Sequence, residues 1–123
     1  MSGYDLLKGV RVLEVAALGP SSLGGYLADM GADVVKVEDA AGDGVRYAGN
    51  PAMGSPNGQS LLHLRWNRGK KSIQLDLKAD RDRATFLQLV AKADVVINTG
   101  CPKTETYRAV RRLIACLTAK RVR

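Results

Sequence analysis

The sequence has few aromatic residues, few cysteines and a single histidine. Among 123 residues there are one Trp, one Phe, four Tyr, two Cys and one His. Two cysteines late in the chain, Cys101 and Cys116, form no disulfide framework, which indicates a reducing compartment. One histidine without clustered cysteines argues against a zinc site and supports no Cys-His or Ser-His-Asp pairing. We therefore expect no metal, and we interpret His63 as structural and Cys101 as incidental.

Long apolar runs and targeting signals are also missing. No stretch approaches the roughly 18 apolar residues of a membrane-spanning helix. The first 15 residues lack the basic and apolar regions of a signal peptide. We expect a cytoplasmic protein with no membrane association, and the length of 123 residues suits one domain.

The positive charge is confined to the C-terminal part of the chain. The net charge is +7, yet residues 1–100 hold 12 Lys and Arg against 11 Asp and Glu. Residues 101–123 hold seven basic residues against Glu105 alone. A nearly neutral body argues against nucleic-acid binding by the main part of the chain, so nucleic acid is not the expected partner.

Short β-branched runs alternate with helix-like segments. The order strand, turn, helix, strand predicts a right-handed βαβ unit in an α/β fold with a parallel sheet. In such sheets, ligands bind beyond the carboxyl ends of the strands. The pattern predicts strands over 10–15, 33–38, 72–77 and 94–98, helices over 21–30, 60–66 and 80–93, and a long loop over 39–59.

The first predicted helix has an unusual start. Ser21 or Ser22 is a suitable N-cap. Gly24 and Gly25 each cost roughly 1 kcal/mol against Ala inside a helix, which indicates close packing or close approach of a ligand. The turn at Gly19 does not have the GxGxxG spacing of a dinucleotide site, although the helix N-terminus behind it could face an anion.

Two polar segments allow two interpretations each. Asp43 and Arg46, in the long loop, could position a ligand, but their spacing favours a solvated surface pair. Arg68, Lys70 and Lys71 form a basic turn that suits phosphate or is simply solvated. The sequence alone does not decide between these two interpretations of the basic turn.

Several segments, taken together and in order, resemble a known family. They are "LKGVRVLEV", "GPSSLGGYLADMGADVVKVE", "GDGVR", "NRGKKSIQLDLK" and "AKADVVI". This series resembles the N-terminal part of class III CoA-transferases, the CaiB/BaiF family. That family includes formyl-CoA transferase, carnitine CoA-transferases and 2-methylacyl-CoA racemase. The resemblance covers residues 7–97, and full members of the family are several-fold longer.

The resemblance implies a fold, a ligand and a reaction. It implies that residues 1–98 are an incomplete, Rossmann-like segment that binds coenzyme A from an acyl-CoA thioester. Family members use a catalytic aspartate, which attacks the thioester to give a mixed anhydride and release the CoA thiolate. That aspartate is expected downstream of Arg123, so no catalytic residue is assigned and no turnover is expected. Family subunits form interlocked homodimers.

The resemblance also implies which residues contact CoA. The matching positions are the turn before Gly19, the end of the third strand, and the end of the fourth strand. Asp39 departs from the pattern, because some members have an arginine there that contacts the adenine nucleotide. The predicted CoA-binding residues are Ala17, Leu18, Leu75, Asp76, Leu77, Lys78, Asn98 and Thr99.

The match to the family pattern is lost close to Thr99. The family continues as Glu-Asn-Phe-x-Pro-Gly, whereas this chain continues Asn98-Thr99-Gly100-Cys101-Pro102. We expect residues 99–123 to be a divergent, helical basic tail, from a frameshifted or truncated gene. The alternative is a genuine helix over 105–120 that caps the sheet or binds an acidic partner. Alternative functions are a stand-alone nucleotide- or partner-binding module and a fragment of a racemase.

Overall fold

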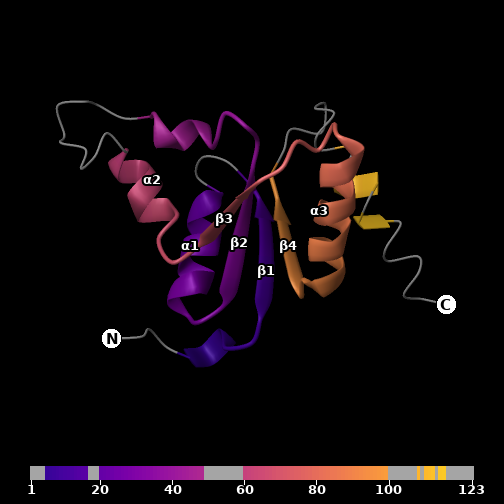
Figure 1. The fold of residues 1–123 in the computed structure, drawn as a ribbon. Coiled ribbons are helices and arrows are strands. Elements are labelled where there is room, and N and C mark those ends of the chain that lie inside the picture. Colours follow the sequence, from indigo (N-terminus) through magenta and orange to yellow (C-terminus); the bar gives the residue numbers. More distant parts are fainter. Residues whose placement is uncertain are drawn as a thin grey trace.

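The computed structural model describes residues 5–16, 20–48, 60–99, 108, 110–112 and 114–115. Figure 1 shows a sheet with α1 and α2 on one side and α3 on the other. This arrangement confirms the predicted α/β class. The elements in chain order are η1 (Asp5–Leu7), β1 (Arg11–Val15), α1 (Ser21–Asp29), β2 (Asp33–Glu38), η2 (Gly44–Arg46), α2 (Leu61–Trp66), β3 (Lys71–Gln74), α3 (Asp80–Lys92) and β4 (Val95–Asn98).

The sheet has four parallel strands in the order β3-β2-β1-β4. In the centre, Leu13 of β1 is in register with Val35 of β2 and Val96 of β4. Parallel strands need a crossover, and here α1 connects β1 to β2 while α3 connects β3 to β4. All four carboxyl ends therefore lie at one edge of the sheet.

Alternate residues of the central strands pack on opposite faces. Val12 and Val34 belong to a buried cluster that includes Leu27 and Ala28 of α1 at its margin. Leu13 belongs to a second cluster, on the α3 face, that includes Phe86. Because the sheet is covered on both sides, β1 and β2 bury apolar residues on both faces.

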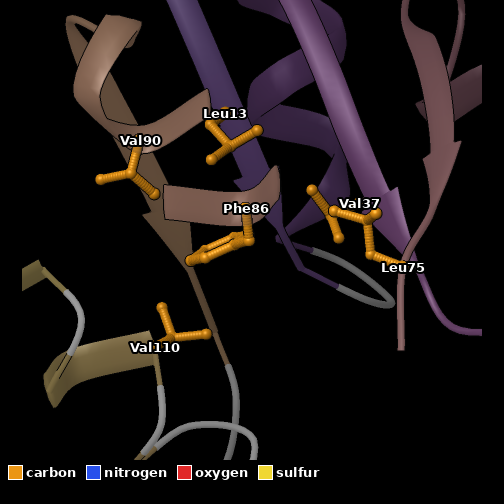
Figure 2. Packing of buried hydrophobic residues seen from close by; sticks show 6 residues of the cluster. All are labelled: Leu13, Val37, Leu75, Phe86, Val90 and Val110. Atoms are coloured by element: carbon orange, nitrogen blue, oxygen red, sulfur yellow. The ribbon is translucent and has the colours of Figure 1, made fainter. Parts of the chain in front are cut away.

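Part of the C-terminal region packs on the α3 face. Residues 108, 110–112 and 114–115 are helical. Val110 is completely buried, and Figure 2 shows the ring of Phe86 between Val110 and Leu13. Ile114 packs against the same cluster. The described tail residues thus contribute to the core. Most of the 105–120 helix proposed as the alternative lies outside the described residues.

The third strand is shorter than predicted. It ends at Gln74, not at Leu77, although the Leu75 N–H still donates to the Glu38 carbonyl at 2.9 Å. The chain then turns because Asp76 Oδ1 accepts from Lys78 N–H at 2.9 Å. After Leu75, this turn, held by the Asp76 side chain, takes the place of further hydrogen bonds between β3 and β2. The other strands and helices agree with the predicted ranges to within one residue at each end.

The predicted serine cap of α1 is wrong. The N-cap is Pro20, which makes no side-chain capping bond. The Ser21 hydroxyl donates instead to the Ala16 carbonyl at 3.1 Å and accepts from Lys36 Nζ at 2.9 Å. The Ser21 hydroxyl therefore binds buried polar partners and does not cap the helix.

Two negative findings concern the described residues only. None of the helices among them is both long and apolar enough to cross a membrane. Within the same ranges, no three His, Cys, Asp or Glu side chains gather where they could hold a metal ion.

Candidate functional site at the carboxyl ends of the strands

A cleft of about 770 Å³ lies at the carboxyl edge of the sheet. Its walls come from the end of β1, the end of β2 with the loop that follows it, and the turn after β3. This is the edge at which parallel α/β sheets bind ligands. The cleft is lined by Val15, Ala16, Lys36, Val37, Glu38, Asp39, Ala40, Ala41, Gly42, Asp43, Gly44, Leu75, Asp76, Leu77, Lys78 and Thr99.

Most of the described site residues predicted from the sequence meet at this cleft. The stretch from Leu75 to Lys78 and Thr99 line it together, although 20 residues separate them in the chain. Asn98 is paired with Val15 in the sheet and does not line the cleft. Ala17 and Leu18 lie outside the described residues. The CoA contacts of all these residues stay predictions.

The turn after β3 offers an uncompensated cation. Lys78 is exposed, and its ammonium makes no ion pair with the described residues. Asp76 lies in the same turn, where its carboxylate accepts the Lys78 N–H. The Asp76 N–H in turn donates to Asp82 Oδ2 at 2.8 Å, which ties the turn to the first turn of α3. Backbone contacts thus fix the turn while leaving the Lys78 side chain available.

The loop after β2 is held by a buried carboxylate. Glu38 accepts from Arg46 at both oxygens, with Nε to Oε2 at 2.8 Å and Nη2 to Oε1 at 2.6 Å. It also accepts from Ser72 Oγ at 2.7 Å and from the Asp43 N–H at 2.7 Å. The hydrogen bond from Arg46, with further ones from Ser72 and Asp43, lowers the pKa of Glu38 from 4.5 to about 2. The carboxylate therefore stays charged and keeps the loop closed at its base.

Asp43 is buried, so the solvated-pair interpretation of Asp43 and Arg46 is wrong. Its Oδ1 accepts the Val45 N–H at 3.0 Å and starts η2, while Oδ2 lies 2.8 Å from Lys36 Nζ. Arg46 binds Glu38, not Asp43. Sequence spacing suggested the wrong pair because both true partners lie in β2, which the loop folds back to meet.

Lys36 connects the strands to this loop. Its side chain is 2% exposed, and its ammonium lies 2.6 Å from the Ala16 carbonyl oxygen, 2.9 Å from Ser21 Oγ and 3.0 Å from Glu14 Oε1. Asp43 is the fourth partner. A buried lysine is tolerated when its charge is paired and its N–H groups are hydrogen-bonded, and here both conditions hold.

Glu14 lies between two lysines. Its Oε1 accepts from Lys36 and from Lys70 Nζ, the latter at 2.9 Å, while its Oε2 is 2.8 Å from Lys70 Nζ. Burial lowers the pKa of Lys70, and the hydrogen bond that Lys70 donates to Glu14 opposes that shift. A Cβ at Gly24 would lie 1.9 Å from Glu14 Oε2. The predicted close packing of this glycine is therefore confirmed: α1 lies directly on the carboxylate.

The basic turn is engaged inside the chain. Lys70 is paired with Glu14, as described above, Arg68 is paired with Asp29 of α1, and Lys71 Nζ is 2.7 Å from Asp33 Oδ1. The last two pairs are partly exposed, and the Arg68 guanidinium also lies 5.2 Å from the centre of the Tyr26 ring. None of the three side chains lines the cleft. The Lys71 side chain is 70% exposed and agrees with the solvated interpretation, whereas Lys70 is buried and does not. The phosphate interpretation stays a prediction.

The structural interpretation of His63 agrees with its surroundings. The side chain is buried in α2, and its Nδ1 lies 3.1 Å from Asn67 Nδ2. Burial, helped by the charge of Arg46, lowers the pKa of His63. The imidazole is therefore neutral at pH 7 and outside the cleft.

The buried charges are the residues that pattern reading missed. Glu14 and Lys36 occupy inward positions in two strands rich in valine, "VRVLEV" and "DVVKVE". Opposite charges at inward positions of adjacent strands are a signal that could have revealed the pair. The β-branched residues around them are enough to predict the strands, so the strand pattern alone does not single out the two charges.

Comparison with known proteins gives consistent results. A succinate–glutarate CoA-transferase of Agrobacterium fabrum is 46% identical over 97 residues, 74% of this chain and 24% of that protein. A succinyl-CoA:mesaconate CoA-transferase of Haloarcula hispanica is 50% identical over 74 residues, 58% of this chain and 18% of that protein. A CaiB/BaiF family protein from Brucella suis has a TM-score of 0.71 at 34% identity, covering 87% of this chain and 30% of that structure.

The chain spans a quarter or less of these two curated relatives and about a third of the solved structure. The sequence profile described as CoA-transferase family III matches residues 7–109, which is most of the chain. On this match, and on the fold it shares with the structural relative, the chain belongs to CoA-transferase family III.

Proposed function

We propose that the chain binds the coenzyme A part of an acyl-CoA thioester in the cleft at the carboxyl ends of its strands. The observation that carries the proposal is the convergence of Thr99 and the turn from Leu75 to Lys78 on one cleft. These two segments are the described ones that the family resemblance singled out independently for CoA contacts. The similar proteins are CoA-transferases by name, which favours CoA transfer between carboxylic acids over racemisation as the parent activity.

Side chains of both charges line the cleft, and Asp39 and Asp76 are among them. One exposed cation favours an anionic ligand at its own wall. Glu38 and Asp43 line the cleft but are neutralised by Arg46 and Lys36. Lys78 is the lining cation that no described carboxylate neutralises. An exposed ammonium on an ordered turn suits a phosphate group, which is how Lys78 would contribute to binding.

The transfer reaction needs more than this cleft. The family reaction uses an aspartate nucleophile, and the resemblance aligns none of the aspartates in this chain with it. We propose binding without turnover for the 123-residue chain. Pairing with a second copy and a cytoplasmic location also belong to this proposal, on the family resemblance alone.

A thermal melt with and without CoA tests the binding proposal. Ligand at 100 times its dissociation constant stabilises the folded state by about 2.7 kcal/mol, so the melting temperature should rise with CoA concentration. Lys78→Met should weaken CoA binding by about tenfold, equivalent to 1.4 kcal/mol. Lys92→Met is the matched control, since Lys92 is exposed at the end of α3 and does not line the cleft. No rise in melting temperature at millimolar CoA would refute the proposal.

A transfer assay tests the second part. The purified chain, given an acyl-CoA donor and a carboxylate acceptor, should form no new thioester above the uncatalysed rate. Turnover comparable to that of the full-length relatives would contradict the proposal that this chain binds without transferring.

A further inference from the structure

The buried Lys36 side chain contacts residues of two walls of the cleft. On one side its ammonium holds the Ala16 carbonyl and the Ser21 hydroxyl, at the end of β1 and the start of α1. On the other side it holds Asp43, in the loop that follows β2. Through Lys36, one buried cation links the two chain segments that face each other across the β1–β2 part of the cleft.

The loop after β2 depends on Asp43 for its shape. Residues 39–44 all line the cleft, and Asp43 is the residue at which this loop returns to the sheet. The Asp43 backbone N–H is held by Glu38, and its Oδ1 starts η2. Within the loop, Gly42 has a φ of 78° and its N–H donates to the Asp39 carbonyl at 3.0 Å. The remaining oxygen, Oδ2, is buried and forms an ion pair with Lys36 Nζ at 2.8 Å, without a hydrogen bond from the described residues.

Burying a lysine at this position costs free energy. Desolvating an ammonium is expensive, and well-packed apolar replacements of buried ion pairs are often neutral or stabilising. Stability alone therefore does not account for Lys36. What an apolar residue lacks is several N–H donors that hold a carbonyl, a hydroxyl and a carboxylate at set positions.

We propose that Lys36 is a positioning residue that sets the separation and shape of the two cleft walls, acting through Asp43 and Ala16 and not by touching the ligand. The inference rests on the proposed function, because the ligand whose binding it supports is coenzyme A. The Lys36 charge is already balanced by Glu14 and Asp43, and its side chain is 2% exposed. It therefore has little charge to offer a phosphate directly.

Variants of the lysine and its loop partner separate positioning from direct contact. CoA affinity is measured by calorimetry on the full 123-residue chain, well below the melting temperature, for Lys36→Met, Asp43→Asn and the double variant. We expect each single variant to weaken CoA binding by about tenfold, and the double variant to be little worse than either one. If Lys36 instead contacts the ligand, Asp43→Asn frees its charge and binding strengthens or stays equal, which would overturn the proposal.

Lys70→Met is the matched control for general destabilisation. Lys70 is a buried lysine on the same Glu14, and its Nζ also donates to the Ser21 carbonyl at 2.5 Å. It forms no ion pair with Asp43 and does not line the cleft, so it lacks the contact with the loop after β2. It should lower the melting temperature as Lys36→Met does and leave CoA affinity unchanged. Equal loss of affinity in both lysine variants would mean that Lys36 acts only through overall stability, and the proposal would fail.

Hydrogen exchange without ligand tests the positioning independently of CoA. The amides of residues 41–46 should exchange faster in Lys36→Met and Asp43→Asn than in Lys70→Met. If CoA does not bind the unmodified chain, the proposed function fails while this measurement still decides whether Lys36 orders the loop. Should Lys36→Met fail to fold, Asp43→Asn carries both tests, because it leaves the Lys36–Glu14 pair in place. Unchanged exchange in the loop would overturn the inference.

Discussion

The two faces of the sheet are built on different principles. The α3 face is an apolar cluster of Leu13, Phe86, Val90 and Val110 with their neighbours. The α1 face contains apolar residues as well, but also the buried ions Glu14, Lys36, Glu38 and Asp43. Apolar packing needs no direction, whereas ion pairs fix the positions of their partners. The comparison teaches that the α3 face is held by apolar packing, whereas the α1 face adds buried ions that hold the loop beside the cleft. Both faces contribute to the cleft, because Val37 and Leu75 of the α3-face cluster also line it.

The largest expected effect is on the apolar face. Phe86→Ala removes a fully buried ring from the centre of the cluster and should lower the free energy of unfolding by about 4 kcal/mol. Urea denaturation measures the loss. Phe86→Leu is the control, because it retains most of the apolar volume and should cost much less. If both variants lose the same free energy of unfolding, the surrounding side chains close the space left by the ring. The stability of the protein would then depend mainly on other residues.

The next effect tests the charged face. Glu14→Gln leaves Lys36 and Lys70 without the carboxylate between them and should cost about 3 kcal/mol at pH 7. Burial already lowers the pKa of Lys70 from 10.5. The cost should shrink as the pH rises toward 10.5, where a neutral lysine needs no partner. A cost independent of pH would show that packing, not charge, holds this face.

The contribution of the tail can be measured at one residue. Val110→Ala removes two buried methyl groups and should cost roughly 2 kcal/mol. Arg112→Ala, on the exposed side of the same helical stretch, is the control and should cost almost nothing. If Val110→Ala leaves the free energy of unfolding unchanged, the tail does not stabilise the α3 face. The origin of residues 99–123 in a frameshift stays a prediction, which sequencing of the source gene would settle.

The Glu38–Arg46 pair predicts a specific acid sensitivity. The pKa of Glu38 is lowered from 4.5 to about 2, so its stabilising effect is complete above pH 4.5 and is lost as the pH falls toward 2. The partial exposure of Arg46 moderates the effect to roughly 2 kcal/mol. Arg46→Gln should remove this part of the acid dependence. Unfolding curves between pH 2 and 6 that keep the same slope in the variant would contradict it.

The smallest effect belongs to the surface pairs. Arg68→Met breaks the partly exposed pair with Asp29 and the contact with Tyr26, at an expected cost of about 0.5 kcal/mol. The loss should fall further in 1 M salt, because screening weakens exposed pairs. A loss as large as that of Glu14→Gln would erase the distinction between the buried ion network and the surface.

The sequence by itself determined the order and type of the elements. The β-branched run in 33–38 and the apolar stripe around Phe86 follow from the local sequence. A helix between successive strands then favours a parallel pair joined by a crossover. The sequence also placed the turn from Leu75 to Lys78 at the carboxyl edge, where the cleft lies. These features depend on near neighbours in the chain, which is why a pattern can reveal them.

Only the tertiary structure decided the partners of the charged side chains. Asp43 and Arg46 suggest each other in the sequence, yet they bind Lys36 and Glu38, and Lys70 binds Glu14, 56 residues away. For the same reason, the Ser21 hydroxyl accepts a hydrogen bond from Lys36 and does not cap α1. Burial makes an unpaired charge so costly that distant partners are brought together. That choice depends on which strands become neighbours, and local pattern does not contain it.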